Sequence, residues 1–360
     1  MSNLYNSYNL YAAPMEKLNI LSLYYNMSNP KSKKPNYKFN LLNNLNYNTY
    51  AKLAVFPEGK IGFVAIKKIP PHTNPFVLTN NQNILYDFVE LEISEIQHLP
   101  HSLKELIHPF LCLETQTYFI PFFGLNTMNF IMYIRFSKSA FEVNLTYDET
   151  NLESELIHFK TTRIISKCEE LIAPGTGFKF NITKIRSSFK TEEIPTKKRL
   201  LLENLSNIFC KIGPTTIPTI TGSGVIAVTN IPSDTNPFIN TNDACYIYNS
   251  VNLSKQTIDN LSNKEVKKIV NDFICPDEKF MYSIPYLGFN SLNVSFFLNH
   301  SNKPNLSVVS DKCEYMGFRT NRPILAGEEL FINYGDYHDS FTELMSFQKA
   351  HYSCEFMIPK

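Results

Sequence analysis

An internal repeat constrains this chain more than any other feature of its sequence. Residues 63–76 (FVAIKKIPPHTNPF) align with residues 225–238 (VIAVTNIPSDTNPF), and seven of the fourteen residues are identical. Residues 120–130 align with residues 284–294 with five of eleven identical, and residues 169–171 align with residues 328–330. The offsets are 162, 164 and 159 residues, so three blocks recur in one order at nearly constant separation. This pattern predicts a tandem duplication, with units of roughly 51–175 and 211–338.

Composition narrows the class of protein. The 360 residues are 43% apolar, which is enough to fill the cores of two domains of ordinary size. A net charge of +1 gives no overall positive field that would attract nucleic acid or an anionic membrane. The sequence contains no run of eighteen apolar residues, so no membrane-spanning helix is expected. Neither a secretory signal nor a transit peptide is expected at the start of the sequence.

The seven cysteines are scattered, with no close pairs. This spacing argues against a disulfide framework and against a cysteine zinc site, so we expect no bound metal and a reducing compartment. We expect an intracellular protein, in the nucleus or the cytoplasm with the nucleus favoured. The run Lys31-Ser32-Lys33-Lys34-Pro35 is a nuclear address, a phosphate-binding patch or a solvated lysine cluster.

Local patterns predict the elements around the repeat. Residues 1–50 are rich in Asn, Tyr and Lys and are expected to stay mobile or to lie over the surface. Strands are predicted at residues 63–66, 118–123, 130–136, 156–160, 282–287 and 294–298. Helices are predicted as two short segments within 94–113, as a basic linker within 181–211, as an insert at 255–275 and as a closing helix within 336–352.

Most of the candidate functional residues lie in residues 294–336. An apolar run leads into Asn299-His300-Ser301, and a Pro-Asn turn follows at Pro304-Asn305. Later, Gly327-Glu328-Glu329-Leu330 leads through three residues to Tyr334 and Gly335. Upstream, Gly222-Ser223-Gly224 precedes a predicted strand, and glycines at such a place let the backbone approach a ligand closely.

Taken together, these motifs resemble the signature of the SET-domain protein-lysine methyltransferases, over most of residues 215–338. The resemblance implies an α+β fold of mainly short β-strands, with a β-clip-like, knotted C-terminal unit that carries a helical insert. The preceding unit would then be a degenerate copy of the same SET-like fold. The expected division is 1–50, an N-terminal segment; 51–175, the degenerate unit; 176–210, a basic helical linker; 211–338, the methyltransferase domain; and 339–360, a closing helix or tail.

The resemblance also implies the residues of the site. Tyr334 and His300 are the candidate catalytic residues. The candidate residues for binding S-adenosyl-L-methionine are Gly222, Ser223, Gly224, Asn299, His300 and Tyr334. The substrate would be a protein bearing a target lysine, histone or otherwise, with no membrane or direct nucleic-acid partner indicated. Methyl transfer needs a neutral lysine amine, and with a pKa near 10.4 only about one lysine in a thousand is neutral at pH 7. A narrow apolar channel disfavours the ammonium form, and a tyrosine hydroxyl with carbonyl oxygens can hold the amine in line.

Departures from the family pattern keep a second function open. Phe296 stands where arginine is usual, Asn302 stands where cysteine is common, and no Cys-x-Cys cluster follows Tyr334. The first unit lacks Asn-His-Ser, and Pro174 is aligned with Tyr334, so this unit is expected to be inactive. The alternative function is therefore a catalytically inactive interaction scaffold that binds chromatin or another partner.

Overall fold

The structure is a computed structural model of the chain. It describes residues 37–56, 59–76, 88–121, 130–150, 155–187, 194–206, 208–218, 222–238, 250–274, 276, 280–285, 289, 294–310 and 316–337. All of these lie in one compact unit, Tyr37–Lys360. Residues 1–36 and 338–360, and with them the lysine run and most of the predicted closing helix, lie outside the described residues, as do parts of the second repeat block.

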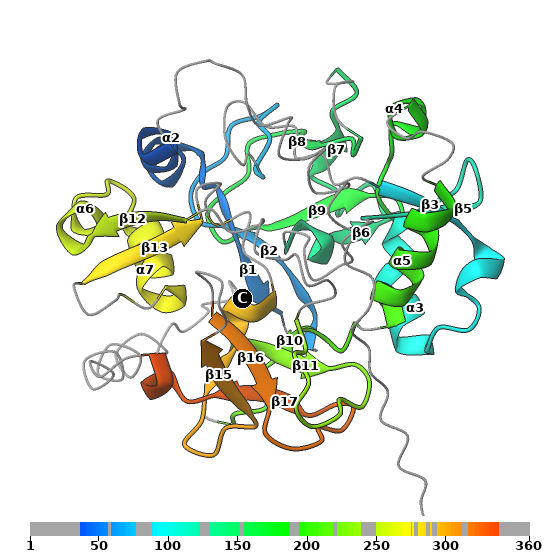
Figure 1. The fold of residues 1–360 in the computed structure, drawn as a ribbon. Coiled ribbons are helices and arrows are strands. Elements are labelled where there is room, and N and C mark those ends of the chain that lie inside the picture. Colours follow the sequence, from blue (N-terminus) through cyan, green and yellow to red (C-terminus); the bar gives the residue numbers. More distant parts are fainter. Residues whose placement is uncertain are drawn as a thin grey trace, which may run out of the picture. The chain divides into compact units, whose positions relative to one another are not determined.

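Short strands and short helices alternate through the first half (Figure 1). Its strands are β1 Ala51–Val55, β2 Ile61–Ala65, β3 Phe88–Glu92, β4 Leu111–Cys112, β5 Thr117–Pro121, β6 Arg135–Ser137, β7 Leu145–Tyr147, β8 Phe159–Thr161 and β9 Glu170–Pro174. Its helices are α2 Tyr37–Asn43, the π-helix η1 Asn44–Asn48, α3 His101–Ile107 and the 3₁₀ helices η3 Ile93–Ile96, η4 His108–Phe110 and η6 Phe130–Tyr133.

Two helices, α4 Ile182–Ser187 and α5 Ile194–Ser206, join this half to the second. The strands of the second half are β10 Cys210–Pro214, β11 Ser223–Ala227, β12 Ser250–Ser254, β13 Met281–Pro285, β14 Asn299–His300, β15 Leu306–Ser310, β16 Met316–Thr320 and β17 Glu329–Ile332. Its helices are α6 Lys255–Asp259, α7 Lys264–Phe273 and the 3₁₀ helices η9 Val294–Phe297 and η10 Tyr334–Tyr337. The prediction of an α+β fold made mainly of short strands is confirmed, as is a helical insert in the second half.

The two four-stranded sheets have the same strand order and the same strand directions. In the first half the order is β1-β2-β9-β6, and in the second it is β10-β11-β17-β14. Each sheet has two antiparallel pairs followed by one parallel pair. Phe63 pairs with Leu171, and Val225 pairs with Leu330, so the register of the central pair also corresponds.

The smaller hairpins and turns correspond as well. The pair β7–β8 matches β15–β16, and β3–β5 matches β12–β13. The buried Thr161 donates its hydroxyl to the Pro70 carbonyl oxygen at 2.6 Å and accepts from the Thr73 amide. The buried Thr320 makes the same two bonds with Pro232 and Thr235. Because a buried hydroxyl must satisfy both its donor and its acceptor, these contacts fix the turn in both halves alike.

Some predicted elements differ from the observed ones. Residues 294–298, predicted as a strand, begin with the 3₁₀ helix η9, and residues 130–136 begin with η6 and become a strand only at Arg135. A short apolar run fits a buried helical turn as well as a strand, and here the buried turn forms. Residues 37–48, expected within a mobile segment, form α2 and η1 and bury Leu41 and Leu45 completely.

The linker helix α5 packs beside β3, and its basic residues are mostly paired with carboxylates. Lys198 contacts Glu95 at 2.9 Å, and Arg199 contacts Glu203 one helical turn away. In the preceding helix, Arg186 makes two hydrogen bonds to Glu90, which lowers the pKa of that carboxyl. The linker is therefore a connector that packs on the first half rather than an open basic surface.

A single hydrophobic core runs through both halves. It includes Phe63, Phe159 and Leu171 from the first half and Val225 and Leu330 from the second, each fully buried. Burial of apolar side chains at about 25 cal/mol per Å² is the main stabilising contribution in a domain of this kind. None of the described helices is both long enough and apolar enough to cross a membrane.

Candidate functional site

The parallel pair of β14 and β17 brings the two motif segments together. Asn299 lies opposite Phe331 and His300 lies opposite Ile332, although about thirty residues separate the strands along the chain. The amide of Ser301 donates to the carbonyl oxygen of Ile332 at 2.9 Å. The strand β17 ends at Ile332, so Tyr334 opens the helix η10 rather than ending the strand. Parallel pairing thus places the Asn-His segment beside the start of the tyrosine segment.

Tyr334 is held from both ends. Its hydroxyl donates to the carbonyl oxygen of Leu298 at 2.7 Å, and its amide donates to Nδ1 of His300 at 3.2 Å. The rings of His300 and Tyr334 lie 5.4 Å apart with an interplanar angle of 50°. Both predicted catalytic residues therefore share one site, and the carbonyl group of Leu298 joins them. Sequence reasoning missed this group, because a backbone carbonyl leaves no mark in the residue type.

The contacts of His300 assign its tautomer. Nδ1 accepts from the amide of Tyr334, so it carries a lone pair, and the proton of the neutral ring lies on Nε2. Nε2 lies 3.1 Å from Oδ1 of Asn302, which can accept that proton's hydrogen bond. Asn302, noted in the sequence only as a departure from the family pattern, thus complements the imidazole.

Asn299 is 8% exposed, and its side-chain amide is held by three acceptors. Nδ2 donates to the carbonyl oxygen of Ser223 at 2.9 Å and to Oε1 of Glu329 at 2.8 Å, and it lies 3.3 Å from Oγ1 of Thr215. Its Oδ1 accepts no hydrogen bond from the described part of the chain. A buried amide that commits both donors presents its oxygen in a fixed direction, which is an acceptor suited to a ligand N–H.

The Gly-Ser-Gly segment lies next to Asn299. Gly222 accepts at its carbonyl oxygen from the amide of Thr215, and Ser223 opens the strand β11. At Gly224 the space that a Cβ would need is taken by the carboxylate of Glu329, with Asn299 Nδ2 also at 3.0 Å. The packing of this internal carboxylate therefore requires glycine at Gly224, and the close approach of a ligand to these glycines stays a prediction.

Glu329 is the residue of this site that the sequence singled out least. Its side chain is buried, and its oxygens accept from the Thr215 hydroxyl, the Thr216 amide and hydroxyl, and the Asn299 amide. Two adjacent acids at the start of a strand are a weak signal, because alternation turns one of them inward without saying which. Here Glu328 is paired with Arg322 at 2.8 Å, and Glu329 points inward.

The first half holds different side chains at the corresponding positions. By strand register, Arg135 takes the place of Asn299, and Phe136 takes the place of His300. The guanidinium of Arg135 donates two hydrogen bonds, each 2.9 Å, to Glu170, the counterpart of Glu329. By strand register, the residue that corresponds to Tyr334 is Gly175 and not Pro174, which corrects the alignment made from the sequence by one residue. Neither residue has a hydroxyl, so the first half still lacks the tyrosine.

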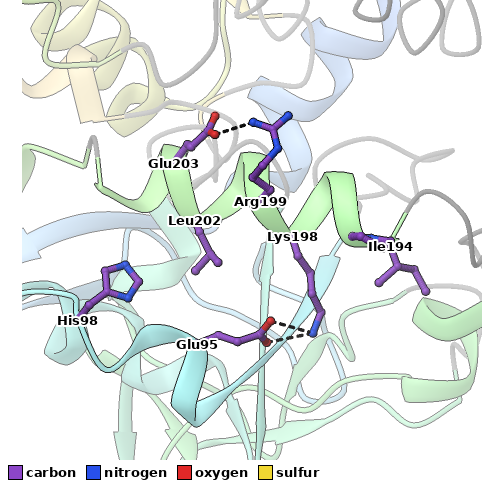
Figure 2. A pocket seen from close by; sticks show the side chains of 8 residues that line it. Glu95, His98, Ile194, Lys198, Arg199, Leu202 and Glu203 are labelled. Carbon is purple, nitrogen blue, oxygen red and sulfur yellow. Dashed lines mark hydrogen bonds and ion pairs between the residues drawn. The ribbon is translucent and has the colours of Figure 1, made fainter.

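A second cavity lies away from these residues. A groove of about 730 Å³ runs along α5, and Figure 2 shows two ion pairs at its rim, Glu95 with Lys198 and Arg199 with Glu203. Ile194, Pro195 and Leu202 supply its apolar lining. None of the predicted site residues lines it, and its charges balance within the groove, so it provides no alternative centre of chemistry.

One family model matches part of the chain. Residues 222–335 match the family model of the SET domain, so the C-terminal part of the chain carries a SET domain. No curated protein matches the sequence. Among solved structures, a Plasmodium falciparum protein described as a candidate histone methyltransferase is 18% identical with a TM-score of 0.23, over 35% of this chain and 93% of that one. Polycomb Repressive Complex 2 of Chaetomium thermophilum is 18% identical with a TM-score of 0.26, over 42% of this chain and 18% of that one. The chain thus spans less than a fifth of the Polycomb chain that it matches.

Proposed function

We propose that the chain transfers a methyl group from S-adenosyl-L-methionine to the side-chain amine of a lysine in a protein substrate. The observation that carries this proposal is the contact between the Tyr334 hydroxyl and the Leu298 carbonyl oxygen, beside His300 and within a SET domain. The knot-like crossing of the two motif segments, and the catalytic roles of Tyr334 and His300, belong to the same proposal.

The groups at the site fit this methyl donor. S-adenosyl-L-methionine supplies an electrophilic methyl group on a positively charged sulfur. The groups around Tyr334 are oxygens with lone pairs, the hydroxyl and the Leu298 carbonyl, which favour polarised methyl hydrogens and amine N–H groups. The Oδ1 of Asn299, held in one direction by three contacts of its own amide, offers an acceptor to an amino group of the cofactor. The cofactor-binding roles of Gly222, Ser223, Gly224, Asn299, His300 and Tyr334 are proposed on this basis.

Tyr334 and Leu298 would orient the lysine amine. The neutral amine has two N–H groups to donate and one lone pair, and the two oxygens can accept both N–H groups while the lone pair points at the methyl carbon. The side chains of Phe297 and Ile332 are buried beside Leu298 and His300 in the chain or across the strand pair, and they would supply apolar walls that disfavour the ammonium form by desolvation. With Tyr334 and Leu298 holding the amine, bound S-adenosyl-L-methionine would supply the methyl group: the N–C bond would form as the S–C bond breaks, leaving a thioether, and the methylated amine would release a proton to water.

The first half is proposed to be a duplicated and catalytically silent copy of the same unit. The corresponding strand orders, registers and threonine contacts support a common origin. Arg135 in the place of Asn299 brings a cation to the position where a sulfonium cofactor would need an acceptor. The domain boundaries 51–175 and 211–338 are part of this proposal.

Replacement of one tyrosine tests the activity. Purified protein should transfer labelled methyl groups to histones or to proteins of a cell extract, and Tyr334→Phe should lower the rate at least about 100-fold, since misplacing a reacting group by about 1 Å costs that much. Tyr147→Phe is the matched control, because Tyr147 in the first half also donates its hydroxyl to backbone carbonyls. A wild type that neither binds the cofactor nor labels any protein contradicts the proposal.

A second candidate function is an interaction scaffold without catalysis. Phe296 and Asn302, which depart from the family pattern, and the altered first half favour it. Titration calorimetry with S-adenosyl-L-methionine separates the two: binding by the wild type that is lost in His300→Ala supports the enzyme, and no binding by the wild type supports the scaffold. Histones or other proteins as substrates, and the nucleus as the location, are proposed from the family alone. Mass spectrometry of methyl-lysines lost on deletion would identify the substrate.

A further inference from the structure

The carboxylate of Glu329 is buried at 3% exposure, yet no ion pair to it occurs among the described residues. In the part of the chain that the structure describes, its oxygens accept hydrogen bonds only from neutral donors. Oγ1 of Thr215 lies 2.9 and 3.0 Å from its two oxygens, and the Thr216 amide and hydroxyl lie 2.5 and 2.7 Å from Oε2. Asn299 Nδ2 approaches Oε1 at 2.8 Å. Burying a carboxylate is costly unless its lone pairs are filled, so this arrangement needs every one of these donors.

The corresponding carboxylate in the first half is satisfied differently. Glu170 is paired with Arg135 through two hydrogen bonds of 2.9 Å. That ion pair balances the charge by itself and leaves its side chain partly exposed, at 19%. At the same register, one half therefore uses a cation and the other uses a set of neutral donors that belong to the proposed cofactor site.

The donors to Glu329 join three separate segments of that site. Asn299 belongs to the Asn-His segment, and Thr215 binds the backbone of Gly222 through its amide. Gly224 lies directly under the carboxylate, which leaves no room for a side chain there. A change at Glu329 therefore reaches Asn299 and the Gly-Ser-Gly segment, whereas the Tyr334 hydroxyl and amide contact Leu298 and His300.

We propose that Glu329 is a positioning residue for the cofactor, which sets the direction of the Asn299 amide and thereby the hydrogen-bonding group that the protein presents to the cofactor. This inference rests on the proposed function and assigns it a residue that does not itself contact the reacting atoms. With Glu329 in place, the amide nitrogen Nδ2 of Asn299 faces the carboxylate, and Oδ1 is left to face the ligand.

The isosteric change Glu329→Gln tests the geometry. If the amide NH2 of the new glutamine takes the place of Oε2, it faces the backbone N–H of Thr216, so two donors oppose each other and the backbone one cannot turn away. If the NH2 takes the place of Oε1, it faces the Nδ2 group of Asn299, and the Asn299 side chain must flip. The flipped side chain loses its hydrogen bond to the Ser223 carbonyl oxygen and presents a donor to the ligand in place of an acceptor. Because the Asn299 side chain can flip and the Thr216 amide cannot turn, we expect the second orientation, in which the cofactor site changes its hydrogen-bonding character while the shape of the Glu329 side chain is kept.

The experiment measures the dissociation constant for S-adenosyl-L-methionine by titration calorimetry on the full chain, for the wild type and three variants. Glu329→Gln should raise it about tenfold or more, the scale of one lost hydrogen bond to a charged group. Glu170→Gln, the matched change in the first half, should leave it within about twofold of the wild type, which is under 0.5 kcal/mol. Thr215→Val should raise it by an intermediate factor, since it keeps the shape but removes one donor to Glu329 and the weakest of the three acceptors of the Asn299 amide.

Two further readouts separate positioning from a general loss of structure. At saturating cofactor, Glu329→Gln should keep most of the wild-type turnover, because Tyr334 and Leu298 are not among its contacts. The side-chain amide resonances of Asn299 should move in Glu329→Gln and stay unchanged in Glu170→Gln. If Glu329→Gln does not fold, Thr215→Val decides between the outcomes.

The outcomes distinguish the two proposals. Binding by the wild type with an unchanged dissociation constant in Glu329→Gln, or in Thr215→Val where Glu329→Gln does not fold, overturns the role of Glu329 and leaves the proposed function standing. A wild type that binds no cofactor overturns the proposed function itself. An equal loss of affinity in Glu329→Gln and Glu170→Gln would mean a global effect of removing either carboxylate, and the positioning role would then be wrong.

Discussion

Two asparagine side chains hold the middle of β9 and β17 by the same contacts. Asn305 donates Nδ2 to the Glu329 carbonyl oxygen at 2.8 Å and accepts at Oδ1 from the Phe331 amide at 2.7 Å. Asn144 makes the corresponding bonds to Glu170 and Ile172 at 2.7 and 2.9 Å. Both side chains are almost completely buried, and each amide bonds a backbone carbonyl oxygen and a backbone N–H as a neighbouring strand would.

At the scale of these residues, Asn305→Ala and Asn144→Ala should each lower the free energy of unfolding by about 2–4 kcal/mol. Either change leaves a buried N–H and a buried C=O without their partner, and each such group costs about 1–3 kcal/mol. Urea unfolding followed by circular dichroism measures the loss. Only Asn305→Ala should also weaken cofactor binding, since its contacts are to β17. A loss below about 0.5 kcal/mol in both variants would mean that water replaces the amide, which contradicts the argument.

At the scale of elements, the two halves differ most where β9 and β17 end. In the second half the chain continues into η10 with Tyr334. In the first half the turn after β9 is held by Tyr147 on β7, whose hydroxyl donates to the carbonyl oxygens of Gly177 at 2.6 Å and Pro174 at 3.0 Å. A tyrosine thus lies at this place in both halves, but Tyr334 belongs to the helix that follows β17, whereas Tyr147 comes from β7 and its role is structural.

Tyr147 gives an expectation at alkaline pH. Burial raises the pKa of Tyr147 to about 12, whereas an unfolded tyrosine ionises near 10. The folded state therefore holds its proton more tightly, so the contribution of this group is fully present below pH 10 and is lost as pH rises from 10 to about 12. Tyr147→Phe should lower the free energy of unfolding by about 1–2 kcal/mol at pH 8 and lower it less at pH 11.5.

Unfolding in denaturant at both pH values measures this difference. Tyr47→Phe is the control, because Tyr47 is 63% exposed, and it should change stability at neither pH. A difference between the wild type and Tyr147→Phe that stays constant across this range would show that the hydroxyl ionises in the folded state as readily as in the unfolded state.

At the scale of the whole molecule, the two halves are joined by buried contacts rather than by surface charge. The Ile212 amide on β10 donates to the hydroxyl of Tyr133 in η6 at 2.8 Å. Part of the Tyr133 ring is exposed, but its hydroxyl is enclosed, and burial raises the pKa of that hydroxyl above its usual range. Lys167 and Glu265 form an ion pair at 2.6 Å across the same junction, and both are substantially exposed.

These contacts predict that the halves unfold together. Scanning calorimetry should give a single transition, because one hydrophobic core includes residues of both. Tyr133→Phe should lower the free energy of unfolding by about 1–3 kcal/mol, since it leaves the Ile212 amide without an acceptor. Lys167→Ala should cost less than about 1 kcal/mol, as exposed ion pairs do. Two separate transitions, with Tyr133→Phe affecting only one of them, would contradict a shared core.

The sequence predicted those parts of the fold that leave a repeated or periodic pattern of residues. The repeat located both sheets, because block identities such as Ile-Pro and Thr-Asn-Pro-Phe lie in turns that both halves share. Helical spacing found the insert α7. The run Val294–Phe297 was misassigned because the four residues Val-Ser-Phe-Phe are too few to show a period. The alignment of Pro174 with Tyr334 was a slip of one residue, since the offset of 159 between the blocks already places Gly175 there.

The site was predicted only in part for a similar reason. Motifs name residues, so His300 and Tyr334 could be selected and the structure places them in contact. The contributions of Glu329, Thr215 and the Leu298 carbonyl arise from tertiary contacts, and those have no local pattern. Asn302 could be seen as a departure, but its contact with His300 could not.

The burial of Glu329 also has a consequence for the order of events during folding. Thr215 and Glu329 are separated by 114 residues, and Asn299 lies 30 residues before Glu329, so the carboxylate receives its donors only after the long loops have closed. Contacts of such sequence separation form late and slowly. Until they form, the carboxylate keeps its water, and Asn299 has nothing to orient it. Competence to bind the cofactor should therefore arise in the last step of folding and report that the whole chain has assembled.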